Sequence, residues 1–305
     1  MTSPGSLLRA VSYNVHECVG TDEVRDLGRV AAVLGELDAD VVGLQEVASE
    51  HGKDSPAGQL HHLARASGLT PVYGPTLKRR TGEYGNGLLT RLPVERISRH
   101  DLSVPGLEPR GILEVGLRAG EVPLRVLVTH LGLRRGERAF QARAVARILA
   151  AGAQGEVTVL LADINEWFPL GTALRHLHRP LKKTPAPRTF PSRLPLLALD
   201  RICVSPSHAL EGVWAHRTPL SRVASDHLPV VASLVLGRPR GVRASAPSKS
   251  SPAEVAKGHP MGLPPWSALA PRNLADAGGV ETPQDRITDA LRERVAELGR
   301  STGGS

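Results

Sequence analysis

The residues of this chain that are suited to chemistry stand at the ends of apolar segments. Ser225-Asp226-His227 in ASDHLPV is the clearest case. The other polar groups are Asn14 and His16 in VSYNVHE, Gln45 and Glu46 in DVVGLQE, His130 in RVLVTHL, Asp163 and Asn165 in VTVLLADIN, and Asp200 in LLALDRI. Carboxylates bind hard divalent cations, an Asp orients water, and histidines hold or protonate a phosphoryl group. These residue types together indicate hydrolysis of phosphate esters.

Strands must deliver these side chains to one rim of a sheet. Apolar, partly alternating segments predict strands at about 7–15, 39–45, 85–91, 111–118, 122–130, 156–163, 198–204 and 228–236. Apolar residues at helical spacing predict helices between some of them, over 24–37 and around 140–148. A further helix is expected over 59–67, with Gly68 as its stop. The pattern is that of a layered α/β domain.

In their order and spacing these segments resemble the endonuclease/exonuclease/phosphatase superfamily, the deoxyribonuclease I-like hydrolases, over residues 7 to 236. The details are closest to its bacterial branch. The resemblance implies a four-layer α/β sandwich, in which two mixed, mainly antiparallel sheets pack face to face and helices cover the outer faces. It places the site at one end of the sandwich. The family includes nucleases, sphingomyelinases and inositol polyphosphate phosphatases, so the substrate stays open.

The resemblance also implies a metal site. Glu46 follows the buried-looking run VVGL, where a carboxylate is costly unless its charge is compensated. By resemblance Glu46 is the principal metal ligand, with Asn14 and Asp226 close to the same ion. Oxygen ligands and a phosphate substrate favour Mg²⁺ or Mn²⁺.

The resemblance gives the catalytic roles to the later segments. Asp163 orients or deprotonates the attacking water, and Asn165 holds a phosphate oxygen or that water. Ala162 stands before Asp163, where the family usually has Gly. His227 faces the scissile phosphate, and Asp200 accepts the other ring proton of this histidine, which favours the imidazolium.

His130 takes the place of the second family histidine and is the candidate general acid. Glu83 in GEYGNG is expected to orient it, and Asn86 to contact the substrate. His16 is a candidate for binding the ion or the phosphate, or for ending the strand. Arg110 suits a phosphate contact, and the loop 188–192 is expected to line the substrate mouth.

The net charge of +8 and the pI of 10.1 suit a protein that meets polyanions: nucleic acid, anionic lipid headgroups or phosphorylated small molecules. Aromatic residues make up 3% of the chain, a thin supply for stacking on bases. A lipid or inositol phosphoesterase needs an apolar mouth or a dense phosphate pocket, and no amphipathic membrane element is evident. A third class, a scaffold without catalysis, is disfavoured because all the principal polar residues are present.

The sequence predicts a catalytic domain over 1–237 and a tail over 238–305 that is rich in Pro, Ser, Gly and Ala. We expect this tail to be disordered, apart from a short helix at 283–298. Cys18 and Cys203 form no C-x-x-C pair, and no segment has the character of a signal peptide or a membrane span. A reducing, cytoplasmic setting is therefore expected.

Overall fold

Two sheets form the centre of the computed structural model, which describes residues 6–50, 58–80, 82–153 and 155–237. The first has the order β10 (Leu210–Ala215), β11 (Val230–Leu236), β1 (Ser6–Asn14), β2 (Val41–Glu50), β4 (Gly82–Thr90) and β3 (Thr70–Arg79). The second has the order β5 (Val94–Asp101), β6 (Gly111–Ala119), β7 (Val122–His130), β8 (Val157–Asp163) and β9 (Asp200–Ser205). The predicted tail and its helix at 283–298 lie outside the described residues.

Both sheets are mixed. β1 pairs with β2, and β7 with β8, in parallel, and the other neighbouring strands are antiparallel. Each parallel pair is joined through a helix, as a parallel connection requires. These helices are α1 (Leu27–Leu37) in the first sheet and α3 (Arg135–Ala150) in the second.

Local signals explain where α1 begins and ends. Oδ1 of Asp26 accepts a hydrogen bond from the backbone N–H of Arg29 at 3.0 Å, which satisfies one free donor of the first turn. The helix ends at Leu37 and is followed by Asp38, which has a left-handed backbone. The other helices are α2 (Gly58–Ser67), α4 (Thr172–Leu177) and α5 (Ser221–Ala224), with short 3₁₀ turns η1 (His16–Cys18) and η2 (Ser207–Ala209).

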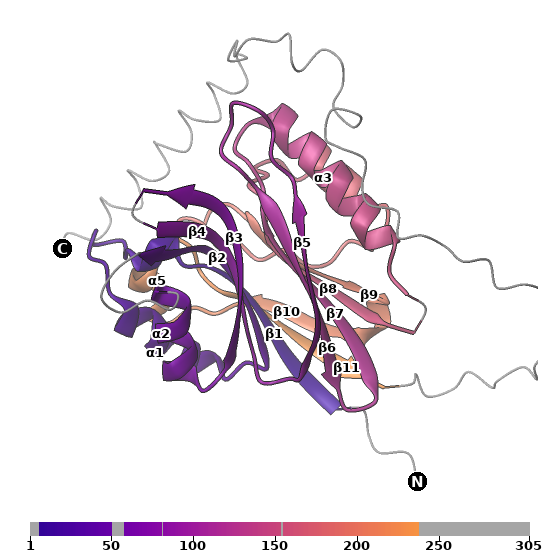
Figure 1. Ribbon diagram of the computed structural model, residues 1–305, viewed down its shortest axis with the longest axis horizontal. Helices are drawn as coiled ribbons and strands as arrows, with labels where there is room; N and C mark the ends of the chain where they lie inside the picture. The colour runs from indigo at the N-terminus through magenta and orange to yellow at the C-terminus, as the bar shows by residue number, and fades with distance from the viewer. Residues whose placement is uncertain (1–5, 51–57, 81, 154, 238–305) are drawn as a thin grey trace, which may run out of the picture.

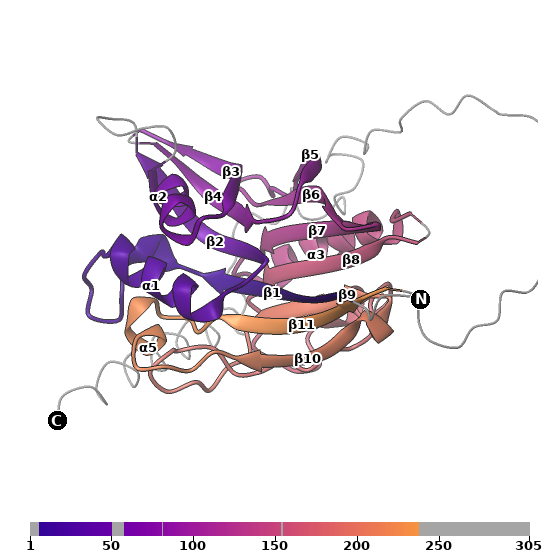
Figure 2. The same cartoon turned by 90° about the horizontal axis from the view of Figure 1, so that it is seen from below.

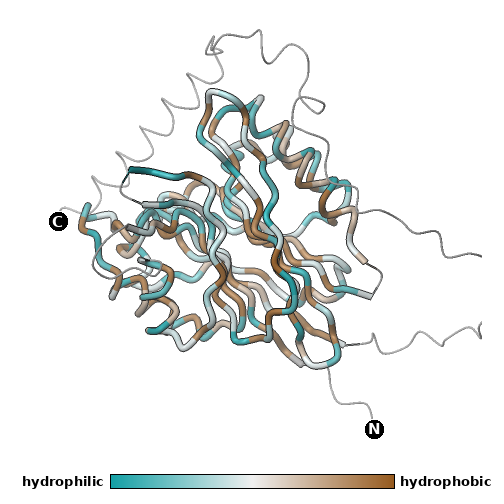
Figure 3. The backbone as a smooth tube through the Cα atoms, viewed as in Figure 1, coloured by the Kyte–Doolittle hydropathy of each residue, from teal (hydrophilic) through white to brown (hydrophobic). Residues whose placement is uncertain are grey.

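Three separate apolar clusters show that the described residues form four layers. One cluster lies between the sheets and includes Val128 and Leu161. A second joins α1 and α2 to the first sheet, and a third joins α3 and α4 to the second sheet. Figures 1 and 2 show α1 and α2 on one outer side and α3 on the other. The apolar residues lie mainly along the central strands (Figure 3). The predicted four-layer α/β sandwich is therefore confirmed.

Candidate active site

The register of the second sheet places three of the predicted residues on one line. His130, the last residue of β7, pairs with Asp163, the last residue of β8. Asp163 pairs in turn with Asp200, the first residue of β9. In the first sheet β1 ends at Asn14, whose side chain donates hydrogen bonds to Glu46 and Asp163. Residues far apart in the sequence thus meet where the two sheets face each other.

Asp163 lies at the centre of this group. Its Oδ2 accepts a hydrogen bond from Nδ2 of Asn14 at 3.0 Å, and its Oδ1 accepts one from the backbone N–H of Asn165 at 2.9 Å. The same Oδ2 lies 3.6 Å from Nε2 of His130 and 3.8 Å from Nε2 of His227. Burial acts to raise the pKa of Asp163, but the two histidines and the donors outweigh it and lower the pKa to about 2. The carboxylate is therefore ionised at neutral pH.

His227 and Asp200 form a buried pair beside Asp163. Nδ1 of His227 lies 2.9 Å from Oδ2 of Asp200. Burial acts to lower the pKa of His227, but the carboxylates of Asp200 and Asp226 raise it to about 10. The ring is thus an imidazolium at neutral pH, with its Nε2 4.0 Å from Oδ1 of Asp226. A buried cation in this position can stabilise negative charge on phosphoryl oxygens.

Glu46 departs from the regular course of β2. Its φ is +59°, and the pairing of β2 with β4 shifts register between Leu44 and Val47. Such a bulge redirects a side chain, and left-handed backbone at a residue other than glycine is concentrated at functional sites. The Glu46 side chain is 17% exposed. Burial, together with the charge of Asp226, raises the pKa of Glu46.

Glu46 and Asp226 fit a divalent cation. The pKa of Glu46 is raised because a mostly covered carboxylate lies close to a second carboxylate, and a cation would relieve both costs. The Asp226 side chain is 33% exposed, so water has access to this part of the site. Mg²⁺ usually keeps several of its water ligands, which such an open edge permits.

Asn14 lies between the carboxylates of Glu46 and Asp163. Its Nδ2 donates to Glu46 at 2.9 Å and to Asp163, while Oδ1, the atom that would bind a cation, accepts the backbone N–H of His16 at 3.0 Å. Asn14 thus holds the two carboxylates together, and the second lone pair of its Oδ1 can also bind a cation, as predicted. The half-exposed ring of His16 lies at the edge of the site, with Nδ1 3.8 Å from Oδ1 of Asp226.

A second group of potential metal ligands lies deeper. One side-chain atom from each of Asp163, Asp200 and His227 lies within 4.8 Å of the others, which is compatible with a metal ion. However, Oδ2 of Asp200 already accepts a hydrogen bond from Oγ1 of Thr189 at 2.5 Å and contacts His227. An imidazolium has no lone pair for a metal. The protonation that the buried carboxylates favour at His227 therefore competes with an ion in this group.

His130 has nitrogen donors on both sides of its ring. A terminal guanidinium nitrogen of Arg110 lies 3.1 Å from Nδ1, and Nδ2 of Asn165 lies 2.8 Å from Nε2. Oxygens of Glu46 and Asp163 lie 3.9 and 3.6 Å from the same two nitrogens. A neutral imidazole has one acceptor nitrogen and an imidazolium has none, so a proton on the ring changes which neighbours attract it. His130 is thus next to both carboxylates of the centre.

β4 delivers Asn86 to the site and Glu83 to the other face of the sheet. Nδ2 of Asn86 donates to a backbone carbonyl of β6 at 3.1 Å, across the space between the sheets. Because side chains alternate along a strand, Glu83, three residues earlier, faces the opposite side. In the structure Arg110 and Asn165 contact the ring nitrogens of His130. The sequence predicts this orienting role for Glu83.

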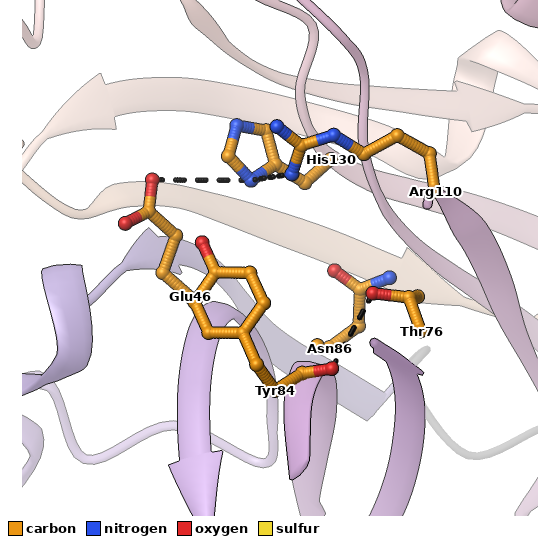
Figure 4. Close-up of a pocket in the computed structure, with 7 residues that line it drawn as sticks. Glu46, Thr76, Tyr84, Asn86, Arg110 and His130 are labelled. Atoms are coloured by element: carbon orange, nitrogen blue, oxygen red, sulfur yellow. Dashed lines mark hydrogen bonds and ion pairs between the residues drawn. The ribbon is translucent and has the colours of Figure 1, made fainter. Parts of the chain in front are cut away.

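A pocket opens between these side chains (Figure 4). It is lined by Glu46, Thr76, Tyr84, Gly85, Asn86, Arg110 and His130. Arg110 is buried, and its Nε has no hydrogen-bond partner among the described residues. A guanidinium that lines a pocket is suited to bind a phosphate oxygen.

Three residues outside the predicted site support it. Oγ1 of Thr189 donates to Asp200, and the ring of Phe190 packs on the ring of His227 with centroids 4.9 Å apart. Both residues are buried and lie behind the pair of His227 and Asp200. The sequence predicts that their loop lines the substrate mouth, but these two side chains do not do so. Oγ of Ser225 donates to the last carbonyl of β1 at 2.8 Å and accepts the backbone N–H of His227 at 3.2 Å.

Comparison with known proteins agrees with this geometry. The profile of the Endonuclease/Exonuclease/phosphatase family matches residues 11–227, and the chain therefore belongs to this family. A protein of Escherichia coli K12, named uncharacterized protein YbhP, is 29% identical over 231 residues, which cover 70% of this chain and 88% of that protein. Among solved structures, an endonuclease/exonuclease/phosphatase from Beutenbergia cavernae is similar with a TM-score of 0.61 and 24% identity, covering 76% of this chain and 72% of that one.

The catalytic domain of human Nocturnin, with bound sulfate, is similar with a TM-score of 0.58 and 21% identity, over 74% of this chain and 93% of that domain. At these sequence identities, the similarity to the two solved structures supports the fold alone. Membership of the family implies metal-dependent hydrolysis of phosphate esters. Within the described residues, no helix has the length and apolar character needed to cross a membrane.

Proposed function

We propose that this protein is a divalent-metal-dependent phosphodiesterase in which Asp163 orients the attacking water. The observation that carries the proposal is the position of the Asp163 carboxylate, which lies within 4 Å of both His130 and His227 and accepts a hydrogen bond from Asn14. A carboxylate whose pKa is about 2 is a weak base. Asp163 therefore acts by orienting the water for in-line attack more than by removing its proton.

Glu46 and Asp226 would hold the cation in this proposal. The bound ion would supply positive charge that neutralises the phosphoryl group and favours ionisation of water. Asn14 keeps Glu46 and Asp163 at a fixed separation, because its amide nitrogen bonds to both. Mg²⁺ and Mn²⁺ both suit oxygen ligands of this kind.

His227 and Asn165 stabilise the charge that develops on the phosphoryl oxygens. The imidazolium of His227 is present before the substrate binds, because Asp200 and Asp226 raise its pKa. Asn165 has a left-handed backbone with φ +48°, and its buried Oδ1 has no partner among the described residues. A bound water or substrate hydroxyl would satisfy that oxygen.

His130, Asn86 and Arg110 act on the substrate from the other side. They line the same pocket (Figure 4). Nε2 of His130 lies 3.6 Å from Asp163, and its Nδ1 lies 3.1 Å from Arg110. In the proposal His130 protonates the leaving oxygen, and Arg110 and Asn86 bind the substrate beside it. His16, at the exposed edge next to Asp226, is a further phosphate contact.

A substrate panel tests the proposal. Purified protein is incubated with Mg²⁺, with or without EDTA, and plasmid DNA, an abasic-site duplex, sphingomyelin, inositol phosphates or bis-p-nitrophenyl phosphate. We expect hydrolysis of at least one phosphodiester that EDTA abolishes and added Mg²⁺ or Mn²⁺ restores. Absence of metal-dependent hydrolysis throughout the panel, in a protein with intact thermal unfolding, would contradict the proposal and favour a scaffold.

A further inference from the structure

Exposed apolar side chains are concentrated on three loops next to the candidate site. Five of the ten large hydrophobic residues that are exposed among the described residues lie on these loops: Leu133, Phe168, Leu170, Leu194 and Leu196. Leu170 is 84% exposed, the highest value of the ten. Exposure of such side chains to water is unfavourable, and a group of them on the surface indicates a site that binds an apolar partner.

The sheet register brings the three loops to one end of the second sheet. Leu133 follows the end of β7, Phe168 and Leu170 follow the end of β8, and Leu194 and Leu196 precede the start of β9. The terminal residues of these strands are paired with one another. All three loops therefore emerge at the edge that carries the site.

Specific contacts hold the loops there. The buried guanidinium of Arg138 donates to the carbonyl oxygen of Leu133 and lies 3.9 Å from Glu166, which joins the first two loops. The third loop is fixed to the site itself, because the backbone N–H of Ser192 donates to the carbonyl oxygen of Asp226 at 2.7 Å. We call these segments, residues 131–136 and 167–199, the apolar-basic rim.

The apolar-basic rim has an extreme charge composition. Lys and Arg occupy eight positions in it and Asp and Glu occupy none, and the flanking Glu137 and Glu166 are buried. Arg134 follows the exposed Leu133 directly, and Arg193 precedes Leu194. The segment 16–26, which Arg193 of the rim contacts through the hydroxyl of Thr21, carries four acidic residues instead. The basic residues of the rim itself would attract an anionic surface.

We propose that the apolar-basic rim docks the protein on a membrane that contains anionic phospholipid, so that the site acts on a phosphoester of a lipid headgroup; this rests on the function proposed above. Leucine and phenylalanine enter the boundary between headgroups and acyl chains, and neighbouring cations bind the lipid phosphates. Four of the five exposed apolar residues are leucines, which do not stack on bases as aromatic platforms do. This composition favours lipid over nucleic acid.

Vesicle sedimentation tests the docking. The full chain is mixed with vesicles of phosphatidylcholine alone or of an equal mixture with phosphatidylglycerol, and the bound fraction is measured at low and high salt. We expect stronger binding to the mixed vesicles, and a weaker effect of composition at high salt. The double variant Phe168→Ser, Leu170→Ser should lose affinity about tenfold or more, since each side chain gives up burial in the interface.

Leu7→Ser is the matched control. Leu7 is 62% exposed at the start of β1, the end remote from Asn14, so its removal should leave vesicle binding unchanged. Equal binding by the wild type and the Phe168→Ser, Leu170→Ser variant would overturn the proposal. Binding of a single-stranded oligonucleotide that needs Lys182 and Lys183, by a protein that ignores the vesicles, would instead assign the rim to nucleic acid.

Activity separates this proposal from the function on which it rests. The rim variant should hydrolyse soluble bis-p-nitrophenyl phosphate at the wild-type rate, and phospholipid in mixed vesicles at a rate reduced about tenfold or more. Vesicle binding without any phosphodiester hydrolysis would leave the docking surface intact and contradict the catalytic assignment. Hydrolysis of the soluble ester without vesicle binding would support the catalytic assignment and contradict the docking surface.

Discussion

At the scale of single residues, the site depends on how buried charges compensate one another. Asp163 is an ionised carboxylate with a pKa of about 2, and His227 is an imidazolium with a pKa of about 10. Both side chains are buried, and several partners stabilise the charge of each. The same charges that keep these groups ionised also prepare the site for a phosphoryl group and a cation.

The pH dependence of turnover should follow His227. In the wild type this ring loses its proton only as the pH rises through about 10. Asp200→Asn removes a carboxylate that raises this pKa, so the proton is lost at a lower pH. We expect the alkaline limb of the pH–kcat profile on bis-p-nitrophenyl phosphate to move toward neutral pH in the variant. An alkaline limb that stays in place would show that His227 does not act as the imidazolium.

Metal binding should depend on Glu46. Glu46→Gln removes a ligand charge with little change in shape, and we expect it to weaken Mn²⁺ affinity by more than about tenfold, as measured by electron paramagnetic resonance. Glu83→Gln is the control, because Glu83 lies on the opposite face of β4 from Asn86. Unchanged affinity in Glu46→Gln, with loss in Asp200→Asn, would place the ion in the deeper group of Asp163, Asp200 and His227.

The sequence identified which residue types end the strands, but not which atom of each side chain faces which neighbour. Asn14 is at the centre, where its amide nitrogen bonds to two carboxylates and its amide oxygen accepts a backbone N–H. Glu83 and Asn86 are close in sequence but on opposite faces of one strand. Hydrogen-bond partners that come from distant segments, as Arg110 does for His130, leave no signal in the spacing of residues.

At the scale of elements, the strands that the sequence did not reveal are β3, β5 and β10, and all three are edge strands. β5 reads VERISRHD and is exposed along much of its length, and β3 contains Pro71 and Pro75. Charged residues and prolines are typical of edges, where they prevent pairing with other chains, and they remove the apolar run by which a strand is recognised. β9 is an edge too, but the apolar segment that predicts it is kept, because its residues are almost all buried.

The packing of the two sheets should be sensitive to a side chain added at Gly43 in β2. A Cβ at this position would lie 2.8 Å from side-chain atoms of Leu161 in β8. We expect Gly43→Ala to reduce the free energy of unfolding by about 1–3 kcal/mol, measured by urea denaturation. In α1, a Cβ at Gly35 meets nothing within 4 Å, so Gly35→Ala should raise stability by about 0.5–1 kcal/mol. Equal effects of the two variants would contradict this view of the sheet interface.

At the scale of the whole molecule, the described fold gathers residues from position 14 to position 227 into one site. Every predicted site residue lies within 6–237, which supports the proposal that this segment is the catalytic domain. A chain that ends at Gly237 should therefore retain the thermal unfolding profile and the turnover of the full chain on a soluble diester. A large fall in turnover with the fold intact would show that residues 238–305 take part in catalysis.

The central claim is that Asp163 orients the water that attacks the phosphorus, and kcat of the Asp163→Asn variant tests it most directly. The measurement uses bis-p-nitrophenyl phosphate, with Mg²⁺ at saturation and with EDTA, beside thermal unfolding of both proteins. The account predicts metal-dependent turnover in the wild type, and a loss of about a hundredfold or more in the variant with an unchanged unfolding profile. Turnover that survives the substitution, or that disappears together with the fold, would contradict it.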